Sequence, residues 1–247
     1  MSPPAEPGTS SAAPPTSPAS PAGRLAAWLA VEVATGPFVA FDSEMVVYLS
    51  NAEGWNQPWA VSRRGGPARR LIESPQRIVA VVPSPTAPEA IIVGDRGGDE
   101  HWQLALLPLE GTRPQPHPLT GAPEHIHTPG VWSPDGSRFY FTSNARDPRF
   151  FDVYALDPAA EAPPRRIREE DECLDVLGAR GDRLLLARRT TNLDTHLLVG
   201  DATGEFTERN PHDGEVTVHG AALGERGEVY AAANPGRERA ALVRLRP

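Results

Sequence analysis

The sequence predicts an all-β fold, a β-propeller of about five four-stranded blades, preceded by a short helix and a tail. Two observations support this prediction. Short segments rich in β-branched and aromatic residues alternate with turn residues, and no helical pattern interrupts them. The same unit then recurs along the chain at a nearly constant period, which is typical of propeller blades.

The clearest unit is residues 131–157, which read VWSPDGSRFYFTSNARDPRFFDVYALD. Residues 133–136, SPDG, are predicted to reverse the chain, because proline presets φ at the first central position and glycine accepts a positive φ. The aromatic segment 138–142 and the alternating segment 151–156 are predicted strands, separated by a loop at 144–148. Together with the strand that precedes the turn, they make most of one blade.

Five positions mark the repeat, each at the end of the second strand of a blade: Asn51, Asp95, Asn144, Arg189 and Asn234. Neighbouring positions lie 44, 49, 45 and 45 residues apart. Each blade would leave an apolar face that only a neighbouring blade can cover. The repeats are therefore expected to stack side by side around an axis.

Before the repeats, residues 1–22 consist largely of proline, alanine and serine. Such a segment has too little apolar surface to offset the entropy of ordering, so we expect a disordered tail, and it lacks the features of a secretory signal. Residues 23–37 follow as an N-terminal helical segment, with Leu25, Trp28 and Leu29 at helical spacing. This helix is expected to pack against the first blade, or alternatively to dock on a partner domain through Trp28.

The propeller is predicted at residues 38–247, and its fifth blade has three strands. That blade would end in an exposed sheet edge, through which we expect the protein to self-associate. The predicted strands, blade by blade, are 38–41, 45–50, 58–62 and 69–72; 78–82, 90–93, 102–107 and 118–120; 128–132, 138–142, 151–156 and 165–168; 174–177, 183–187, 196–199 and 205–209; and 216–221, 228–232 and 240–245.

Charge and composition exclude several functional classes. All 24 basic residues are arginine, and the 32 acidic residues give a net charge of −8. An acidic chain without a basic block is a poor ligand for nucleic acid or for an anionic membrane. The absence of lysine excludes Schiff-base and P-loop chemistry. Cys173 is the only cysteine, so an internal disulfide is excluded, and we expect a reducing, cytoplasmic location.

Several motifs resemble a known family. Residues 132–136, WSPDG, resemble the strand and turn of TolB-type propeller repeats. Residues 95–100, DRGGDE, followed by WQL at 102–104, are similar to the second-blade motif of acylaminoacyl-peptidase-like members of the prolyl oligopeptidase family of serine peptidases. Residues 143–148, SNARDP, with FDVY at 151–154, resemble the next blade of those proteins. The resemblance covers residues 25–157 and is reduced to the period alone after them.

The resemblance implies a seven-bladed propeller that caps an α/β-hydrolase domain and filters substrates to small peptides. The hydrolase domain of the family carries a Ser-Asp-His triad, but this sequence has no G-x-S-x-G motif and two fewer visible repeats. No catalytic residue of the family can therefore be placed here, and no cofactor is expected. By this resemblance the chain is an incomplete, non-catalytic propeller module, whose partners would be a separate or missing hydrolase domain and a peptide substrate.

The loops that join the second and third strands of the blades should emerge on one face. They contain the residues that we predict to face the substrate: Arg96, Asp99, Glu100, Arg146 and Asp147. Two other interpretations remain open. The chain could be a stand-alone TolB-like platform for protein interactions, or a small propeller hydrolase that uses channel carboxylates, including Asp152, for acid–base chemistry. A metal at His125 and His127 is not expected, because a clear third ligand is missing.

Overall fold

A computed structural model of the chain describes residues 20–42, 44–111, 114–160 and 162–246. The chain divides into two compact units, Met1–Val33 and Ala34–Pro247. The predicted tail falls mostly on residues 1–19, outside the described residues.

The one described helix, α1 (Pro21–Leu29), begins two residues before the predicted helical segment. The reason is a cap: the Oγ of Ser20 accepts the backbone N–H of Gly23 at 2.9 Å. Pro21 then takes the first helical position, where its missing N–H leaves no donor unpaired. None of the described helical segments is long and apolar enough to cross a lipid bilayer.

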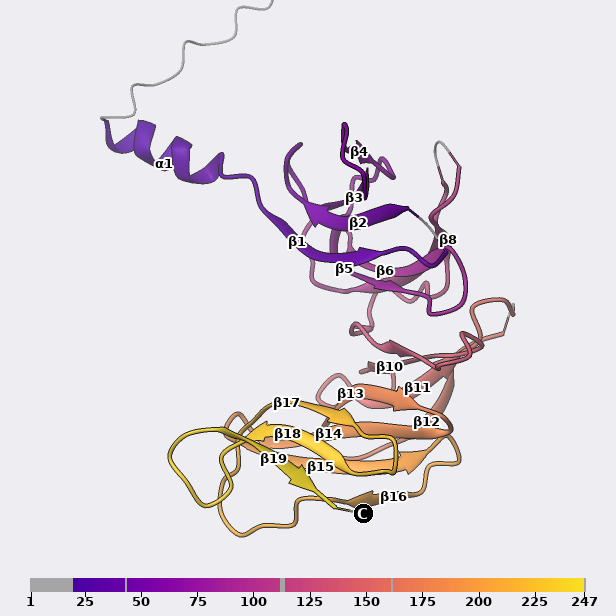
Figure 1. The fold of residues 1–247 in the computed structure, drawn as a ribbon, viewed down its shortest axis with the longest axis vertical. Coiled ribbons are helices and arrows are strands. Elements are labelled where there is room, and N and C mark those ends of the chain that lie inside the picture. The colour runs from indigo at the N-terminus through magenta and orange to yellow at the C-terminus, as the bar shows by residue number, and fades with distance from the viewer. Residues whose placement is uncertain (1–19, 43, 112–113, 161, 247) are drawn as a thin grey trace, which may run out of the picture. The chain divides into compact units, whose positions relative to one another are not determined.

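The strands of Ala34–Pro247 form five antiparallel sheets, which we call blades one to five (Figure 1). In each blade the strands follow one another in chain order, with four strands in blades one to four and three in blade five. The blades consist of β1 (Ala34–Val39), β2 (Met45–Ser50), β3 (Gln57–Ser62) and β4 (Arg69–Arg70); β5 (Arg77–Pro83), β6 (Glu89–Asp95), β7 (Gln103–Pro108) and β8 (His117–Pro118); β9 (Val131–Trp132), β10 (Phe139–Ser143), β11 (Asp152–Leu156) and β12 (Arg165–Arg168); β13 (Cys173–Arg180), β14 (Arg183–Thr191), β15 (Asp194–Asp201) and β16 (Phe206–Glu208); and β17 (Val218–Leu223), β18 (Val229–Ala233) and β19 (Ala241–Leu245).

The predicted propeller pattern is therefore confirmed, and every predicted strand overlaps an observed one. The first strand begins at Ala34, four residues earlier than predicted. The predicted turn at residues 133–136 is also present. Gly136 has a φ of 71°, its N–H donates to the carbonyl oxygen of Ser133 at 2.9 Å, and Asp135 Oδ1 accepts the N–H of Ser137 at 3.1 Å.

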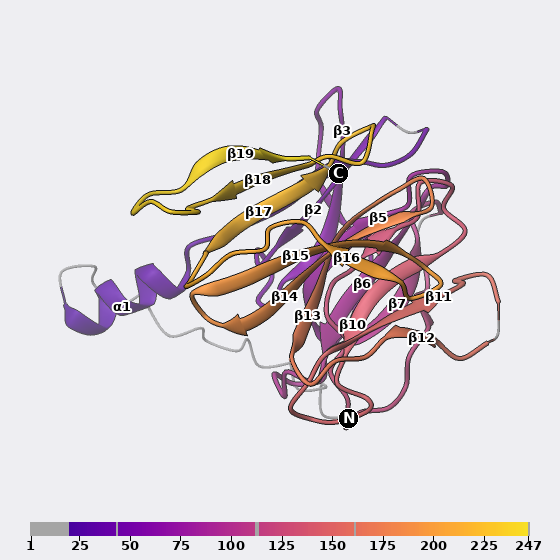
Figure 2. The same ribbon diagram turned by 90° about the horizontal axis from the view of Figure 1, so that it is seen from below.

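The core is a series of apolar clusters, one between each blade and the next along the chain. The clusters join blades one and two, two and three, three and four, and four and five. Figures 1 and 2 both place the blade-five strands beside those of blade four, in agreement with the last of these clusters. Each blade thus covers the apolar face of its neighbour, as the repeat requires.

Alternation along the central strands explains why they are apolar on both faces. In β10, Phe139 and Phe141 pack toward blade two, whereas Tyr140 between them packs toward blade four. In β14, Leu184 and Leu186 pack toward blade three, and the residues between and after them pack toward blade five. Successive strand residues point to opposite faces, so a strand between two blades needs apolar residues at every position.

Candidate functional site

The loops between the second and third strands lie at the same end of each blade, because all blades have the same antiparallel order. Polar side chains at the repeat-marking positions hold this end together. The carboxylate of Asp95 accepts a 2.6 Å hydrogen bond from the guanidinium group of Arg77, at the start of the same blade. Asn144 and Asn234 each accept a backbone N–H at 2.7 Å, from Ile126 and Thr217. These residues therefore tie the end of the second strand to the start of the first strand or to the segment that leads into it.

The blade-two loop contains three of the predicted substrate-facing residues, Arg96, Asp99 and Glu100, and all three are exposed. Arg96 and Asp99 line a cavity of about 320 Å³, together with Gln103 and other residues of this blade. Glu100 is not among the lining residues, and its φ of 60° places it in the left-handed region. Gln103 is held in place in the lining of this cavity, since its amide donates to the carbonyl oxygens of Ala122 and His125.

The blade-three loop contains the other two predicted residues, and both have partners within the chain. Arg146 donates to both carboxylate oxygens of the fully buried Asp152, at 2.7 and 3.1 Å, and to Asp171 at 3.2 Å. The hydrogen bond to Asp152 is the main cause of a raised pKa for Arg146. Hydrogen bonds from Arg149 lower the pKa of Asp147 to about 2. Arg146 and Asp147 are therefore ion-paired within the chain, and neither of them lines the blade-two cavity.

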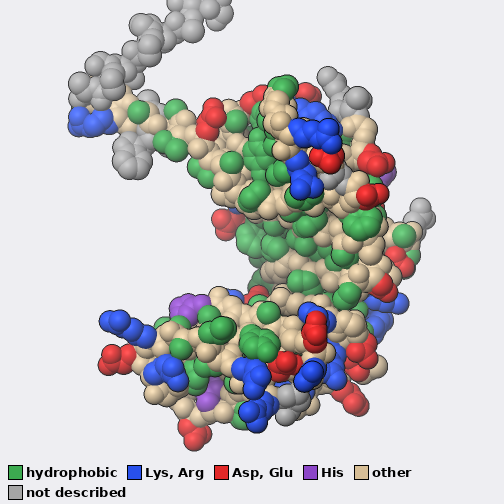
Figure 3. All heavy atoms as spheres, in the orientation of Figure 1, with side chains coloured by type: hydrophobic (Ala, Val, Ile, Leu, Met, Phe, Trp, Pro, Cys, Tyr) green, Lys and Arg blue, Asp and Glu red, His purple; other side chains and the backbone are tan. Residues whose placement is uncertain are grey.

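Residues 168–172, REEDE, belong to a network of ion pairs, in which arginines balance the acidic side chains. Each of its acids contacts an arginine: Glu169 with Arg166, Glu170 with Arg168, Asp171 with Arg146 and Glu172 with Arg188. Arg188 also lies 3.5 Å from both Glu170 and Glu208. Acidic and basic side chains are interspersed in the same way on the face seen in Figure 3. The network carries charged contacts from the blade-three loop into blade four.

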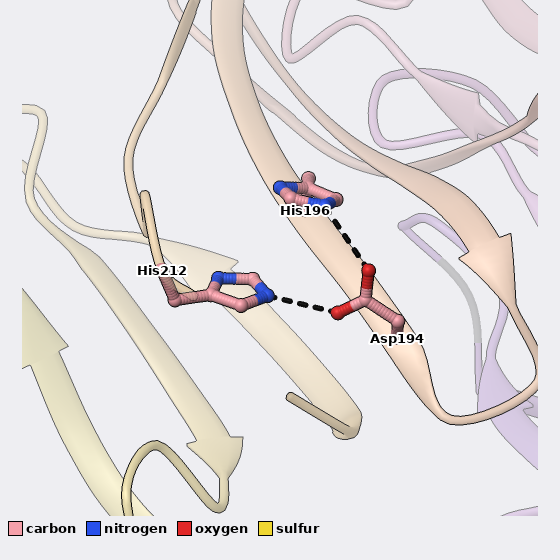
Figure 4. A group of neighbouring side chains, drawn as sticks. All are labelled: Asp194, His196 and His212. Atoms are coloured by element: carbon pink, nitrogen blue, oxygen red, sulfur yellow. Dashed lines mark hydrogen bonds and ion pairs between the residues drawn. The ribbon is translucent and has the colours of Figure 1, made fainter. Parts of the chain in front are cut away.

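The network continues to a cluster of three residues in blade four, Asp194, His196 and His212 (Figure 4). Asp194 begins β15, His196 lies two residues later on the same side of the strand, and His212 comes from the loop between β16 and β17. The carboxylate of Asp194 is 3.2 Å from His196 Nε2 and 2.8 Å from His212 Nε2. The imidazole rings stack with their centroids 4.6 Å apart.

The other polar atoms of the cluster also have partners. His196 Nδ1 lies 2.6 Å from Glu208 Oε1, and His212 Nδ1 bonds to the carbonyl oxygen of Asn210. Burial alone would raise the pKa of Asp194, but hydrogen bonds from His212, Thr190 and the Val216 N–H outweigh it and lower that pKa well below its usual range. Burial would lower the pKa of His212, but its bonds to Asp194 and Asn210 raise it above the ordinary value. The cluster thus joins one carboxylate to two imidazoles, one from β15 and one from the segment before β17.

Sequence reasoning missed this cluster. The D-x-H spacing of Asp194 and His196 places both on one strand face, which is a weak signal, but His212 arrives through a loop whose path the sequence does not reveal. The sequence directed attention instead to His125 and His127. His127 is buried against Phe141, and neither of its ring nitrogens has a partner among the described residues. Burial, with a smaller effect of His125, lowers the pKa of His127 to about 4.

Comparison of the sequence with protein families and with curated proteins gave no match. Solved structures do match. A puromycin-hydrolyzing peptidase from Mycobacterium tuberculosis superposes with a TM-score of 0.69 and 16% identity, over 86% of this chain and 35% of that one. The β-propeller domain of the Trilobed protease from Pyrococcus furiosus gives 0.58 and 14%, over 81% and 64%. A putative TolB from Agrobacterium tumefaciens gives 0.54 and 16%, over 69% and 62%.

The chain spans about a third of the length of the puromycin-hydrolyzing peptidase that it matches. The matches extend over 69% to 86% of this chain, and one of the matched structures is itself a β-propeller domain. The chain has the fold of a β-propeller of the kind found in puromycin-hydrolyzing peptidases and in TolB.

Proposed function

We propose that the chain is the non-catalytic propeller module of a prolyl-oligopeptidase-like serine peptidase, and that it filters peptide substrates for an α/β-hydrolase domain. The similarity to a puromycin-hydrolyzing peptidase carries this proposal. It extends over 86% of the chain with a TM-score of 0.69, compared with 0.54 for the putative TolB. The motifs at residues 95–104 and 143–154 support the same family.

In this proposal the exposed loops at one end of the blades meet the peptide. The blade-two cavity offers both signs of charge, from Arg96 and Asp99, and these could contact the carboxylate and the amine of a short peptide. Glu100 lies beside them on the same exposed loop. The role of Arg146 and Asp147 in facing substrate stays a prediction, since their described partners lie in blade three and in the segment between β12 and β13.

Steady-state kinetics of the peptidase that contains this chain, purified from its native source, would test the filter. We expect cleavage of short fluorogenic peptides and much slower cleavage of an unfolded protein. Arg96→Ala and Asp99→Ala are expected to raise KM several-fold with little change in kcat, because they remove binding but not chemistry. The exposed Arg237→Ala is the matched control. Equal cleavage of peptides and unfolded protein, with both loop variants unchanged, would refute the filter.

A second candidate function is a stand-alone TolB-like platform for protein interactions. It is favoured by one observation, that the match covers 62% of the putative TolB but only 35% of the peptidase. The two proposals differ in what binds the chain. If the chain is a platform, its purification from the native source would also recover a partner protein without a hydrolase domain. The purified complex would then have no peptidase activity.

We propose a cytoplasmic location for the module, as expected from a single cysteine. Cys173 is only partly buried and is free of any disulfide. A reducing compartment would keep this thiol from forming disulfides between chains.

A further inference from the structure

We propose that Asp194, His196 and His212 bind a zinc-type divalent transition metal at the joint between blades four and five. Each residue offers one ligand atom, and these atoms lie within 4.8 Å of one another. Two imidazoles and one carboxylate are the ligand types that such ions take from proteins. This metal site is independent of the substrate filter proposed above.

The distances suit a metal without a large rearrangement. Two ligands of a tetrahedral zinc ion lie about 3.3 Å apart, given metal–ligand bonds of about 2 Å. His212 Nε2 lies 2.8 Å from Asp194 Oδ1, and His196 Nε2 lies 3.2 Å from Asp194 Oδ2, so each histidine is already close to that separation from one carboxylate oxygen. Both Nε2 atoms face the same carboxylate, as Figure 4 shows. A metal would replace the hydrogen bonds that now join the three side chains.

The surroundings of the cluster hold each imidazole by its other nitrogen. His196 Nδ1 is bound to the carboxylate of Glu208, and His212 Nδ1 to the carbonyl oxygen of Asn210. Metal-binding histidines in proteins are commonly oriented in this way, by a carboxylate or a backbone carbonyl at the nitrogen that does not bind the metal. Thr190 and the Val216 N–H bond to the Asp194 carboxylate and fix it in turn.

Comparison with the other blades separates this cluster from an ordinary ion pair. Blades two and three tie the same end together with arginine, as Arg77 with Asp95 and Arg146 with Asp152. A guanidinium group carries only donors and cannot bind a metal. Blade four places two imidazoles at the corresponding joint, and imidazole is a common metal ligand. The presence of two imidazoles in blade four, where blades two and three have arginine, therefore points to a bound metal ion.

The metal would join two segments that the chain separates. Asp194 and His196 lie on β15, and His212 lies on the segment that leads to β17. The backbone already connects them once, since the N–H of Thr195 donates to the carbonyl oxygen of Val216 at 2.9 Å. A bound ion would add a second, stronger connection and would stabilise blade five against blade four.

The experiment is titration of the untagged chain, stripped of metal, with Zn²⁺ against a chromophoric chelator. Co²⁺ serves as a second probe, through the visible absorption of a tetrahedral site. We expect one equivalent of Zn²⁺ to bind and to raise the midpoint of thermal unfolding, with reversal by EDTA. His212→Gln and Asp194→Asn should weaken binding at least 100-fold. Glu208→Gln should weaken it roughly 10-fold, because it removes the carboxylate charge that raises the basicity of His196.

The matched controls are His219→Gln and Glu205→Gln, which alter exposed residues of the same types nearby and should leave affinity unchanged. Circular dichroism checks the folding of every variant. If a ligand variant does not fold, Glu208→Gln decides, because its carboxamide still offers His196 a hydrogen-bond acceptor. Absence of Zn²⁺ binding to the parent chain would overturn the proposal, and so would equal binding to the parent and to the folded variants of the cluster.

Discussion

Arg146 shows how one side chain fixes a hairpin loop. Its guanidinium group bonds to both oxygens of the buried Asp152, to Asp171 and to the carbonyl oxygen of Glu170. The loop between β10 and β11 is thereby tied to the segment before β13. A buried carboxylate without its cation is costly, whereas an exposed ion pair contributes little.

Arg146→Ala is therefore expected to lower the midpoint of thermal unfolding by roughly 10 °C, because it leaves Asp152 buried without its cation. Arg149→Ala, in the same loop, breaks the exposed pair with Asp147 and should lower it by roughly 2 °C or less. Differential scanning calorimetry measures both. Equal effects of the two substitutions would show that the Arg146 contacts are not structural.

His127 makes stability depend on pH, since its pKa is lowered to about 4 in the folded chain, from an unfolded value near 6.5. Between these values the unfolded chain binds more protons, so the free energy of unfolding decreases as the pH falls. The loss is up to about 3 kcal/mol and is complete below pH 4. His127→Leu should remove this part of the pH dependence in urea unfolding at pH 7 and pH 4.5.

The control for His127 is the exposed His117→Gln, which should keep the slope of the parent chain. The buried ring nitrogens of His127 have no partner among the described residues, so an apolar replacement leaves no hydrogen bond broken there. A His127→Leu chain that loses as much stability on acidification as the parent would contradict the assignment.

At the scale of elements, Gly130 precedes β9 at a close crossing of backbones. A Cβ atom at this position would lie 1.9 Å from the carbonyl oxygen of Tyr140. Gly130→Ala should therefore destabilise blade three by roughly 2 kcal/mol or more, because backbone must move. Gly178→Ala in β13, where a Cβ meets nothing within 4 Å, is the control and should change stability by less than about 1 kcal/mol. Urea unfolding monitored by tryptophan fluorescence measures both.

The strands could be predicted from the sequence because their signals are local. Alternation and turn residues such as Gly136 lie within a few residues of the structure that they determine. Strand ends were less predictable: β14 extends to Thr191, since Arg189 and Thr191 pair with Thr195 and Asp194 although polar residues there resemble a loop. The metal-type cluster could not be predicted, because His212 reaches Asp194 only through the fold.

At the scale of the whole molecule, the outer edge of blade five is where the predicted self-association should occur. β19 is the last strand of its sheet, and Leu242 on it is 78% exposed. An exposed apolar edge strand can pair with another copy. Leu242→Lys should shift the chain to monomer, whereas Arg244→Lys on the same strand should not. Light scattering after size-exclusion chromatography measures this, and a parent chain that stays monomeric at high concentration would contradict it.

Similarity to solved peptidase structures supports the function that we propose, in which this chain contributes a propeller to a serine hydrolase whose nucleophile lies outside residues 1–247. The most direct measurement is labelling with a fluorophosphonate probe after immunopurification of the chain from its native source, followed by mass spectrometry of the labelled peptide. The claim predicts a labelled serine in an α/β-hydrolase sequence, on the same polypeptide or on an associated one, and no labelling of the recombinant chain. A labelled serine within residues 1–247, or active chain preparations that yield no labelled serine at all, would contradict it.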